Sequence, residues 1–562
     1  MDDALAVCVR ERPGNLCAIA NGLDFGHAAL CFEQLPQRIA VDVLHHDVLA
    51  ALVRTGVVDT DDVLVLEPGD NRGLTVESSD EFCICSGELV SQDLHGDPTL
   101  QALILGQPDF GDATGSEQAL EPVSSIYDFR RVQNEVKPGE LISRERNAEL
   151  ALLAGAFAFI ALAWRSLDAA AFATPSDTGR IVTQFALSAL AGNVILRLIV
   201  PRAPAQAYAI ACFLAAVGLA FVIRLAPDSA QDQANWVSVG IVAFGACAWL
   251  GRRHELLRRY TYTSGAIALG LLVFTGLFGT TFNGARLWVV VAGQTIQTTE
   301  LIKFFVVIFL AGYLAERGAV LATPKIKLGT RTYSNLPYLV PLIALLFATI
   351  AALALLRDLG SIALLVLLSV SMVFLATGRA RYLAGGLALL AITGFAGYFA
   401  FNHAQVRIDV WLNPGNDPAG SGYQTLQSTY AIQAGGITGE GLGLGQPDAI
   451  PAAATDYIFS AIAEELGLAG AIGIIMLYVT LLYAGLHASL RAPTQFGRLL
   501  CTGVSLIFAI QAAVIIGGNL RVIPTTGITL PFISYGGSSL VVNFALLGLL
   551  CGIAGLRQSD SS

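Results

Sequence analysis

Residues 337–377, PYLVPLIALLFATIAALALLRDLGSIALLVLLSVSMVFLAT, decide the fold class of this chain. They contain two apolar runs, 337–356 and 360–377, separated only by a short polar break. Each run has the ~20 residues that a helix needs to cross the hydrocarbon core of a bilayer. Ten further runs of this kind occur at 149–165, 181–200, 205–225, 235–250, 263–280, 300–316, 383–401, 458–488, 500–518 and 532–555. We therefore predict an all-α polytopic membrane protein with about twelve transmembrane helices.

The first 148 residues have a different composition. The chain of 562 residues is only 14% charged, against about 25% for a soluble domain, and the deficit lies after residue 148. We predict that residues 1–130 form a small N-terminal α+β cytoplasmic domain of unknown role, followed by a linker over 131–148. The expected strands are Leu5–Val9, Asp62–Leu66 and Glu81–Cys85, and Val41–Val53 has helical spacing.

The charge and the cysteines exclude several classes of function. The net charge of −10 comes largely from the N-terminal region and gives no indication of nucleic-acid binding. Nine cysteines, an odd number without paired spacing, argue against a disulfide framework. We find no pattern that predicts a resident metal.

The distribution of Lys and Arg sets the expected orientation, because these residues favour the cytoplasmic side. With the N-terminus inside, the inner loops carry fourteen: Arg197, Arg202, Arg252, Arg253, Arg258, Arg259, Arg317, Lys325, Lys327, Arg331, Arg379, Arg381, Arg491 and Arg498. The outer segments carry seven: Arg165, Arg180, Arg224, Arg286, Arg357, Arg407 and Arg521. Both termini are therefore expected in the cytoplasm, and residues 402–457 outside.

Polar motifs gather in the outer segments. Asn283-Gly-Ala-Arg-Leu-Trp288 precedes Glu300 and Lys303, which lie three residues apart and so share one face of a helix. Arg357 and Asp358 lie in the break between the two runs quoted above. From the residues alone, structural roles explain these groups as well as functional roles do. Glu300 and Lys303 would then be an interfacial pair beside the aromatic anchor Trp288, and Asp358 would cap a helix.

The longest outer segment, 402–457, ends in a carboxylate at the membrane boundary. Charged groups are costly to desolvate there, so Asp456, just before the span at 458, is a functional candidate. Glu464 and Glu465 follow inside that span, and at least one of them should be paired or protonated. The segment also contains Arg407, Gln424, Gln427, Ser428 and a glycine-rich run over 439–445.

The last outer segment is rich in helix-breaking residues. It contains Asn519 and Arg521, then Pro524-Thr-Thr-Gly527 and Pro531-Phe-Ile-Ser-Tyr-Gly-Gly-Ser-Ser539. Prolines and glycines in this pattern predict a turn at the membrane edge.

These motifs together resemble the SEDS family of polytopic membrane proteins, the RodA and FtsW type. The similarity extends over about residues 205–557, and the stretch 524–539 resembles the family's most specific signature, P.TG..LPF.SYGGSS. The chain departs from the family pattern at Leu287, where a second Arg is usual, and at Thr298-Thr299, Leu356-Arg357, Ala452 and Ala454.

The resemblance implies a SEDS-like core of ten transmembrane helices within 201–557, preceded by two additional helices within 149–200. It implies a peptidoglycan glycosyltransferase that polymerises lipid II, the undecaprenyl-pyrophosphate-linked disaccharide pentapeptide, at the outer membrane face. Asp456 would be the catalytic base. The substrate-binding residues implied are Arg286, Glu300, Lys303, Asp358, Arg407, Gln424, Gln427, Ser428, Arg521, Ser534 and Tyr535.

The chemistry also suggests partners. The leaving diphosphate needs positive charge, either from these basic side chains or from a divalent cation, Mg or Mn. The protein partner that the family implies is a class B penicillin-binding protein, a transpeptidase. The other implied partners are lipid II and the lipid of the bacterial plasma membrane.

Two other classes of function stay open at this point, a lipid II flippase or other transporter and a non-catalytic scaffold for cell-wall synthases. Symmetric halves with paired broken helices would indicate a transporter, and the sequence shows no such halves. A role in elongation, division or sporulation is not distinguished.

Overall fold

The computed structural model describes residues 138–556, except short gaps at 171–174, 204, 283–284, 292, 323–324, 329–330 and 335, and four strands before residue 138. The chain divides into two units, Met1–Glu140 and Leu141–Ser562. In the first, β1 (Ala6–Val9) pairs antiparallel with β4 (Phe82–Cys85), and β2 (Val63–Val65) with β3 (Thr75–Glu77). β1, β2 and β4 coincide with the expected strands. The expected helix Val41–Val53 lies outside the described residues, so the α+β domain stays a prediction.

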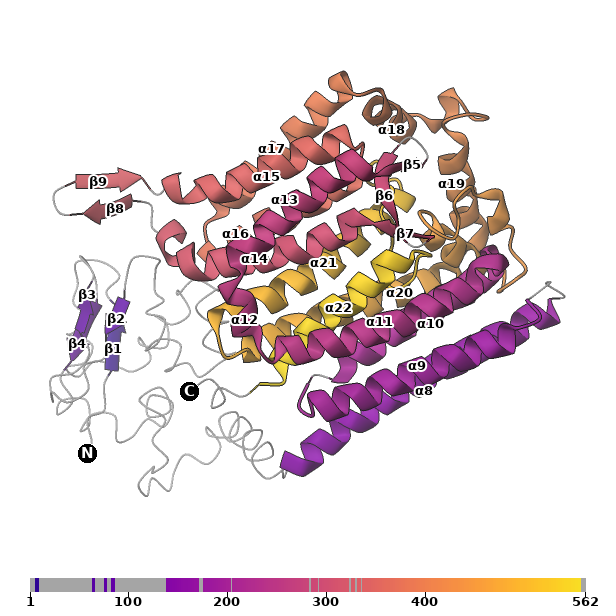
Figure 1. The fold of residues 1–562 in the computed structure, drawn as a ribbon, viewed down its shortest axis with the longest axis horizontal. Helices are drawn as coiled ribbons and strands as arrows, with labels where there is room; N and C mark the ends of the chain where they lie inside the picture. The colour runs from indigo at the N-terminus through magenta and orange to yellow at the C-terminus, as the bar shows by residue number, and fades with distance from the viewer. Residues whose placement is uncertain are drawn as a thin grey trace, which may run out of the picture. The chain divides into compact units, whose positions relative to one another are not determined.

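The second unit is a helical bundle, and twelve of its described helices are long and apolar enough to cross a membrane. They are α8 (Pro138–Ala169), α9 (Thr178–Ile199), α10 (Ala205–Leu225), α11 (Ala230–Gly251), α13 (Thr261–Phe278), α14 (Thr298–Ala322), α15 (Val340–Leu355), α16 (Leu359–Thr377), α17 (Ala380–Ala400), α20 (Ile458–Arg491), α21 (Gln495–Asn519) and α22 (Gly537–Ala554) (Figure 1). The prediction of an all-α polytopic membrane protein is confirmed.

Some helix boundaries differ from the predicted ones. The runs predicted at 235–250 and 300–316 belong to longer helices, α11 of 22 residues and α14 of 25 residues. The last span begins at Gly537 rather than at 532, because residues 531–535 form turns and bends before it.

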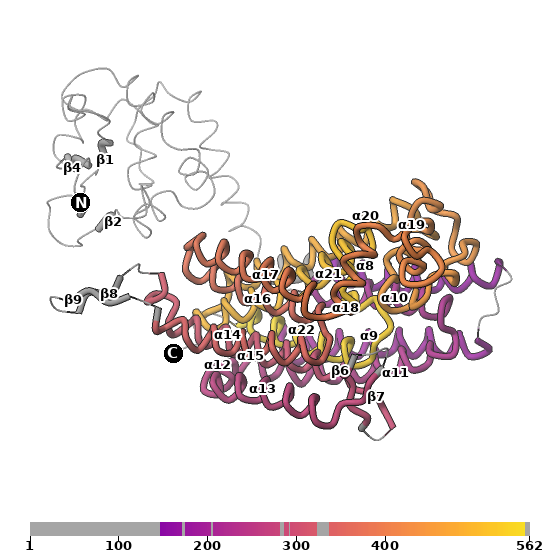
Figure 2. Tube along the Cα trace, turned by 90° about the horizontal axis from the view of Figure 1, so that it is seen from above, coloured from indigo at the N-terminus to yellow at the C-terminus, as the bar shows by residue number. Residues whose placement is uncertain are grey.

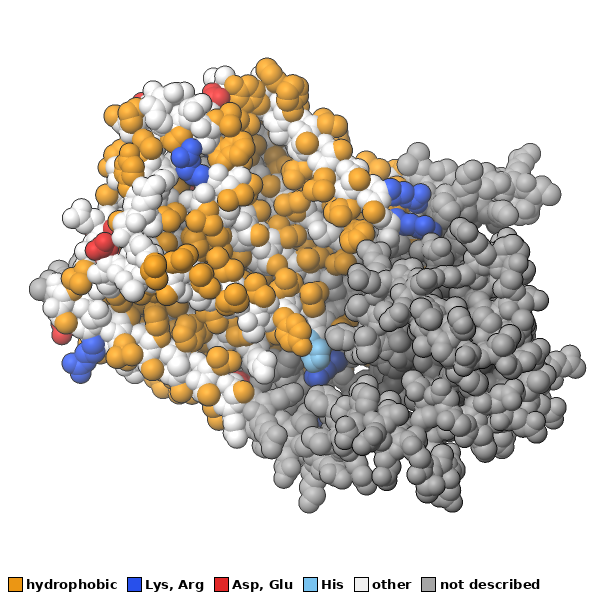
Figure 3. Space-filling view, turned by 180° about the vertical axis from the view of Figure 1, so that it is seen from behind, with side chains coloured by type: hydrophobic (Ala, Val, Ile, Leu, Met, Phe, Trp, Pro, Cys, Tyr) orange, Lys and Arg blue, Asp and Glu red, His pale blue; other side chains and the backbone are white. Residues whose placement is uncertain are grey.

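The centre of the bundle is formed by α10 and α22, most of whose residues are buried. Small residues let α22 approach α11 closely: a Cβ added at Gly548 would overlap the Phe244 carbonyl oxygen of α11. By contrast, α17 has no buried residue, as expected for a helix that faces lipid. The face seen in Figure 3 is largely hydrophobic, and its few charged side chains lie near the borders.

The connections contain secondary structure that the sequence did not indicate. β5 (Thr280–Phe282), β6 (Ala285–Val291) and β7 (Gln294–Gln297) form a three-stranded antiparallel sheet between α13 and α14. The predicted loop 402–457 contains α18 (Asn402–Leu412) and α19 (Tyr423–Gly435). At the other membrane side lie α12 (His254–Arg259) and a hairpin of β8 (Lys325–Leu328) and β9 (Arg331–Ser334).

Helix α20 is broken near its first third. Gly467, with φ of 66°, leaves the helical conformation there. The segment 436–441 crosses the break and satisfies the freed backbone groups: Gly441 N–H donates to the Glu465 carbonyl (3.0 Å), and Leu468 N–H donates to the Gly436 carbonyl (3.0 Å). Such compensation is needed because an unsatisfied backbone group is costly within a membrane. Figure 2 shows α10, α19 and the region of α20 together at one end of the bundle.

Candidate functional site

Asp456 lies in the turn immediately before α20, and its backbone is held from two sides. Its N–H donates to the carbonyl of Ala452 (3.1 Å), a residue with φ of 57°. The buried Asn519 side chain, at the end of α21, donates to the Asp456 carbonyl (2.9 Å) and accepts from the Ser460 N–H (3.2 Å). The backbone that carries the Asp456 carboxylate is therefore fixed by a contact between two helix ends.

The Asp456 side chain faces a cavity of about 140 Å³. Its walls come from α18, α19, the start of α20, the end of α21 and the turn that follows α21. They are formed by Val406, Arg407, Val410, Ser421, Gln424, Thr425, Asp456, Tyr457, Ile515, Gly518, Asn519, Thr525, Thr526 and Gly527.

Gly527 lies where a carboxylate and a guanidinium meet. A Cβ added there would lie 3.3 Å from an Arg407 guanidinium nitrogen and 3.6 Å from Oδ2 of Asp456, so both side chains converge on this glycine. Its φ of 71° also favours glycine. Arg407 is itself anchored, because its Nη1 donates to the Thr525 carbonyl (3.0 Å).

The electrostatics of the cavity suit a proton acceptor. Burial raises the pKa of Asp456, while the Arg407 guanidinium and a hydrogen bond with Thr455 act in the opposite direction. A carboxylate with a raised pKa is a stronger base than an exposed one, which favours proton transfer near neutral pH.

The signature turn after α21 supports the wall that carries Asp456. The Ser534 hydroxyl donates to the Thr455 carbonyl (2.6 Å) and accepts from the Leu530 N–H (2.9 Å). The Tyr535 N–H donates to the Ala454 carbonyl (2.9 Å). Ser534 and Tyr535 thus hold the residues before Asp456 and do not line the cavity.

The polar residues predicted on 423–435 lie on α19. Gln424 lines the cavity and donates from Nε2 to the Pro451 carbonyl (2.6 Å). Ser428 is buried, and its hydroxyl lies 2.7 Å from that of Ser460 on α20. Gln427 is half-buried and lies outside the cavity lining.

Arg521 connects two segments that lie at the same end of the bundle as Asp456. Its Nη2 donates to the Trp411 carbonyl (3.1 Å), and the Trp411 indole N–H donates to the Arg521 carbonyl (2.9 Å). This reciprocal pair connects α18, which carries Arg407, to the turn after α21.

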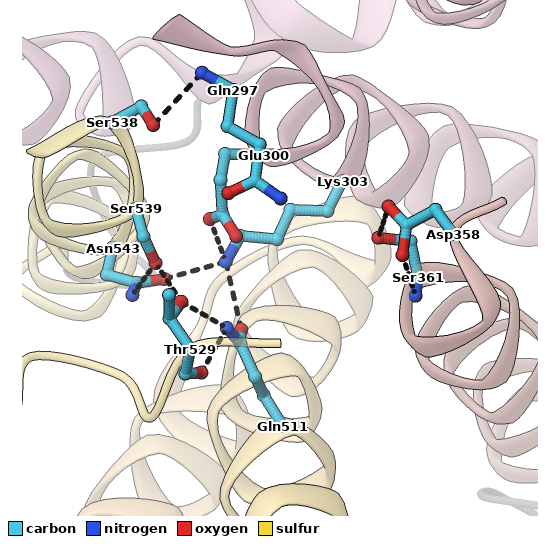
Figure 4. A network of polar contacts seen from close by, with 10 residues as sticks. All are labelled: Gln297, Glu300, Lys303, Asp358, Ser361, Gln511, Thr529, Ser538, Ser539 and Asn543. Atoms are coloured by element: carbon cyan, nitrogen blue, oxygen red, sulfur yellow. Dashed lines mark hydrogen bonds and ion pairs between the residues drawn. The ribbon is translucent and has the colours of Figure 1, made fainter. Parts of the chain in front are cut away.

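Glu300 and Lys303 form a separate buried network (Figure 4). Lys303 is 1% exposed and pairs with Glu300 of the same helix (2.5 Å). Its ammonium also donates to Gln511 Oε1 (2.9 Å) and Asn543 Oδ1 (3.0 Å), on α21 and α22. The three acceptors match the three donors of a lysine, so this network ties α14, α21 and α22 together.

Asp358 caps α16 and adjoins the cavity indirectly. Its carboxylate accepts from the Ser361 N–H (2.9 Å) and hydroxyl (2.6 Å), while burial raises its pKa. A Cβ added at Gly360 would overlap Ile528 and approach Thr526, so this cap packs on the turn that holds Gly527.

Arg286 lies on β6 and is exposed. Its Nε and Nη1 donate to the carbonyls of Gly279 (2.8 Å) and Gly276 (2.9 Å), at the end of α13. Cations stabilise a helix C-terminus, and Arg286 takes that role here.

Glu464 and Glu465 lie beside the break in α20, and the expectation that one of them is paired is met. The buried Arg224 of α10 donates to Glu465 Oε1 (3.1 Å), to Asp448 (2.7 Å) and to the Gly445 carbonyl (3.2 Å). Glu464 accepts from the Gln446 N–H (2.7 Å).

Of the predicted residues, Asp456, Arg407 and Gln424 line the cavity, and Ser428, Arg521, Ser534 and Tyr535 hold its walls. The prediction did not assign Asn519, Thr425 or Gly527. Asn519 and Gly527 stand in the same motifs as Arg521 and Pro524, which is the signal that could have indicated them.

The described residues contain no group of three or more His, Cys, Asp or Glu that could hold a metal ion. In the cavity the single carboxylate of Asp456 faces an arginine, and this donor set does not fit a resident divalent cation.

Comparison with known proteins agrees with these motifs. Residues 209–559 match the FTSW_RODA_SPOVE family, described as cell cycle protein. The chain belongs to this family. Peptidoglycan glycosyltransferase RodA of Mycobacterium tuberculosis is 35% identical over 446 residues, which cover 75% of this chain and 93% of the relative. Stage V sporulation protein E of Bacillus subtilis is 34% identical over 51% of this chain and 75% of its own length.

A solved structure described as "Structural coordination of polymerization and crosslinking by a peptidoglycan synthase complex" is also similar. It is 28% identical with a TM-score of 0.51, and the match covers 61% of this chain and 95% of that chain. Together with the twelve apolar helices, these matches identify the protein as a multi-pass membrane protein of the FtsW and RodA type.

The similarity to the mycobacterial RodA extends further toward the N-terminus than expected. Residues 209–562 are 354 residues (562 − 209 + 1), or about 63% of the chain, whereas the RodA match covers 75%. The match must therefore include residues before 209, in the region of α8 and α9. The two additional helices are thus shared, at least in part, with the mycobacterial relatives.

Proposed function

We propose that this protein is a peptidoglycan glycosyltransferase that polymerises lipid II into glycan strands at the extracytoplasmic face of the bacterial plasma membrane. The observation that carries the proposal is the convergence of Asp456 and Arg407 on Gly527, in a cavity at the membrane boundary of a family member. Relatives named peptidoglycan glycosyltransferase support the reaction class.

In the proposed reaction Asp456 is the base. Its carboxylate takes the proton from the hydroxyl of the acceptor sugar, and the oxygen forms a bond to the anomeric carbon of the donor. The bond from that carbon to the diphosphate breaks, and the lipid diphosphate leaves with the electron pair. The raised pKa of Asp456 favours the proton transfer.

Arg407 has two roles in this proposal. Its positive charge keeps Asp456 ionised enough to act as a base, and it offers hydrogen-bond donors to a diphosphate oxygen. A divalent cation, Mg or Mn, would arrive with the diphosphate of the substrate, since the described donor set does not hold one. No step depends on it.

The remaining predicted residues support the site from greater distance. Arg286, Glu300, Lys303 and Asp358 are proposed to stabilise the helix ends and the turn on which the cavity is built. A class B penicillin-binding protein transpeptidase is the proposed partner, by analogy with the synthase complex of the similar structure. Both termini are proposed to be cytoplasmic.

The test is polymerisation of lipid II by the purified protein. We expect Asp456→Asn to reduce the rate by ~10²–10⁴-fold, the usual effect of losing a positioned base, while the melting temperature stays near that of the wild type. Asp409→Asn is the matched control, because Asp409 is an acid of α18 whose contact with the Tyr398 hydroxyl the amide can keep. A flippase or scaffold would not show this loss, so full polymerisation by purified Asp456→Asn contradicts the proposal.

A further inference from the structure

A second cleft, of about 720 Å³, lies away from the Asp456 cavity. It is formed by the first turns of α9, by the short 3₁₀ helix η1 (Pro227–Ser229) and by the first turns of α11. The α9 wall precedes residue 209, where the family match begins, whereas the α11 wall lies within it. The cleft therefore exists only because the additional helices join the core.

Side-chain amides form a fixed array along this cleft. Gln231 Nε2 donates to Gln184 Oε1 (2.8 Å) and to Asn235 Oδ1 (3.0 Å). Gln184 Nε2 donates in turn to Asn235 Oδ1 (3.0 Å). These bonds join α9 to α11, so the array is held in place before any ligand arrives.

Charged groups at the rim are available to a ligand. The side chains of Asp177, Arg180 and Asp228 are exposed and make no hydrogen bond or ion pair with any residue that the structure describes. The amide nitrogen of Asn235 is also without a partner among these residues. Donors, acceptors and both signs of charge thus line one concave surface.

The cleft opens at the same membrane side as the Asp456 cavity. Leu225, at the end of α10, packs against the cluster that contains Tyr457, the neighbour of Asp456. Pro227, two residues further along the chain, begins η1. Arg224 of the same helix end bonds to Asp448, in the segment before Asp456.

The lining indicates the chemistry of the ligand. Apart from Pro175, Pro227 and the buried Ile181, it is polar, whereas the centre of a protein–protein interface is apolar and rich in aromatic residues. Amides and carboxylates suit the hydroxyl and amide groups of a saccharide chain with attached peptide. The volume lies within the range of small-ligand sites, about 300–1,000 Å³.

We infer that this cleft is an accessory binding site for the nascent, uncrosslinked glycan strand. It holds part of the saccharide–peptide chain at the outer face while the strand is extended at the Asp456 cavity. The inference rests on the proposed function, because it assigns the occupant as the product of that reaction.

The test uses the full-length purified protein and the double variant Gln184→Ala with Asn235→Ala, which removes the amide array. Gln206→Ala is the control, since Gln206 is an exposed amide at the opposite end of α10. We expect the double variant to bind soluble uncrosslinked glycan oligomers several-fold more weakly, and to make several-fold shorter strands from lipid II. Its initial rate of lipid II consumption should stay within about two-fold of the wild type.

The two readouts separate this inference from the proposed function. If the wild type polymerises lipid II and the double variant matches it in strand length and glycan binding, the inference is wrong and the enzyme assignment stands. If the wild type does not polymerise lipid II, the proposed function fails. The binding measurement still decides whether the cleft binds uncrosslinked glycan. The inference would also be overturned if the double variant bound glycan like the wild type but lost its contact with a transpeptidase. The cleft would then be a contact surface for a protein partner.

Discussion

At the scale of single residues, the site depends on small geometric conditions around one carboxylate. The Asn519 side chain holds the Asp456 carbonyl. The Asp456 and Arg407 side chains meet at Gly527, where no side chain separates them. Each condition can be changed separately, which makes the roles of these residues measurable.

Gly527→Ala tests the convergence on the glycine. The new methyl group would lie 3.3 Å from Arg407, and the φ of 71° would strain an alanine by roughly 1–2 kcal/mol. We expect polymerisation to fall by roughly 10- to 100-fold through displacement of the two side chains. Gly415→Ala is the control, because nothing lies within 4 Å of its added Cβ and its φ is not positive. Equal activity of both variants would show that the cavity tolerates the methyl group.

Arg407→Gln tests the electrostatic role of the arginine. Catalysis needs an ionised Asp456, so the rate falls as the pH drops through the pKa of this group. Arg407 lowers that pKa against the effect of burial, and its loss should raise the pKa further. We therefore expect the acid limb of the pH–rate profile to move to higher pH. Arg381→Gln, at the other membrane side, should leave the limb in place; a limb that moves to lower pH with Arg407→Gln would contradict this role.

At the scale of elements, the break in α20 separates the short helix that follows Asp456 from the longer span. Gly467→Ala should destabilise the protein, because the φ of 66° disfavours alanine and its Cβ would overlap the Gly439 amide. We expect a loss of at least ~1 kcal/mol in the free energy of unfolding, seen as a lower melting temperature in detergent. Gly473→Ala, on the same helix with open space around it, should be neutral or slightly stabilising. A higher melting temperature for Gly467→Ala would show that α20 can become continuous.

The elements also show what the sequence could predict. All twelve spans were predictable, because each is an apolar run that only a membrane or a buried core accommodates. The break in α20 was not, since a single glycine within an apolar run is compatible with a continuous helix, and the bonds that stabilise the break come from residues 436–441. Asp456 was a candidate from its position at the membrane boundary, and the family motifs added Arg407 and Gln424. Asn519 and Gly527 stand in the same motifs as predicted residues, but their contacts with Asp456 became evident only when the helix ends were placed together in space.

At the scale of the whole molecule, the charge distribution predicts which side faces the cell exterior. In a cysteine-free background, Asn416→Cys should react with an impermeant maleimide in intact cells, because residue 416 is exposed between α18 and α19. Glu255→Cys, on the exposed surface of α12, should react only after lysis. The reverse pattern would invert the topology and place Asp456 on the cytoplasmic side.

The ion pair between Arg224 and Glu465 also has a consequence in time. The two residues are 241 positions apart, so at about 5–20 residues per second a ribosome completes α10 roughly 12–48 s before it makes the acid. During that interval the arginine has to keep its head group in contact with water at the membrane surface. Helix α10 can therefore settle in its final place only after α20 has been synthesised, and the centre of the bundle is among the last parts to close during biosynthesis.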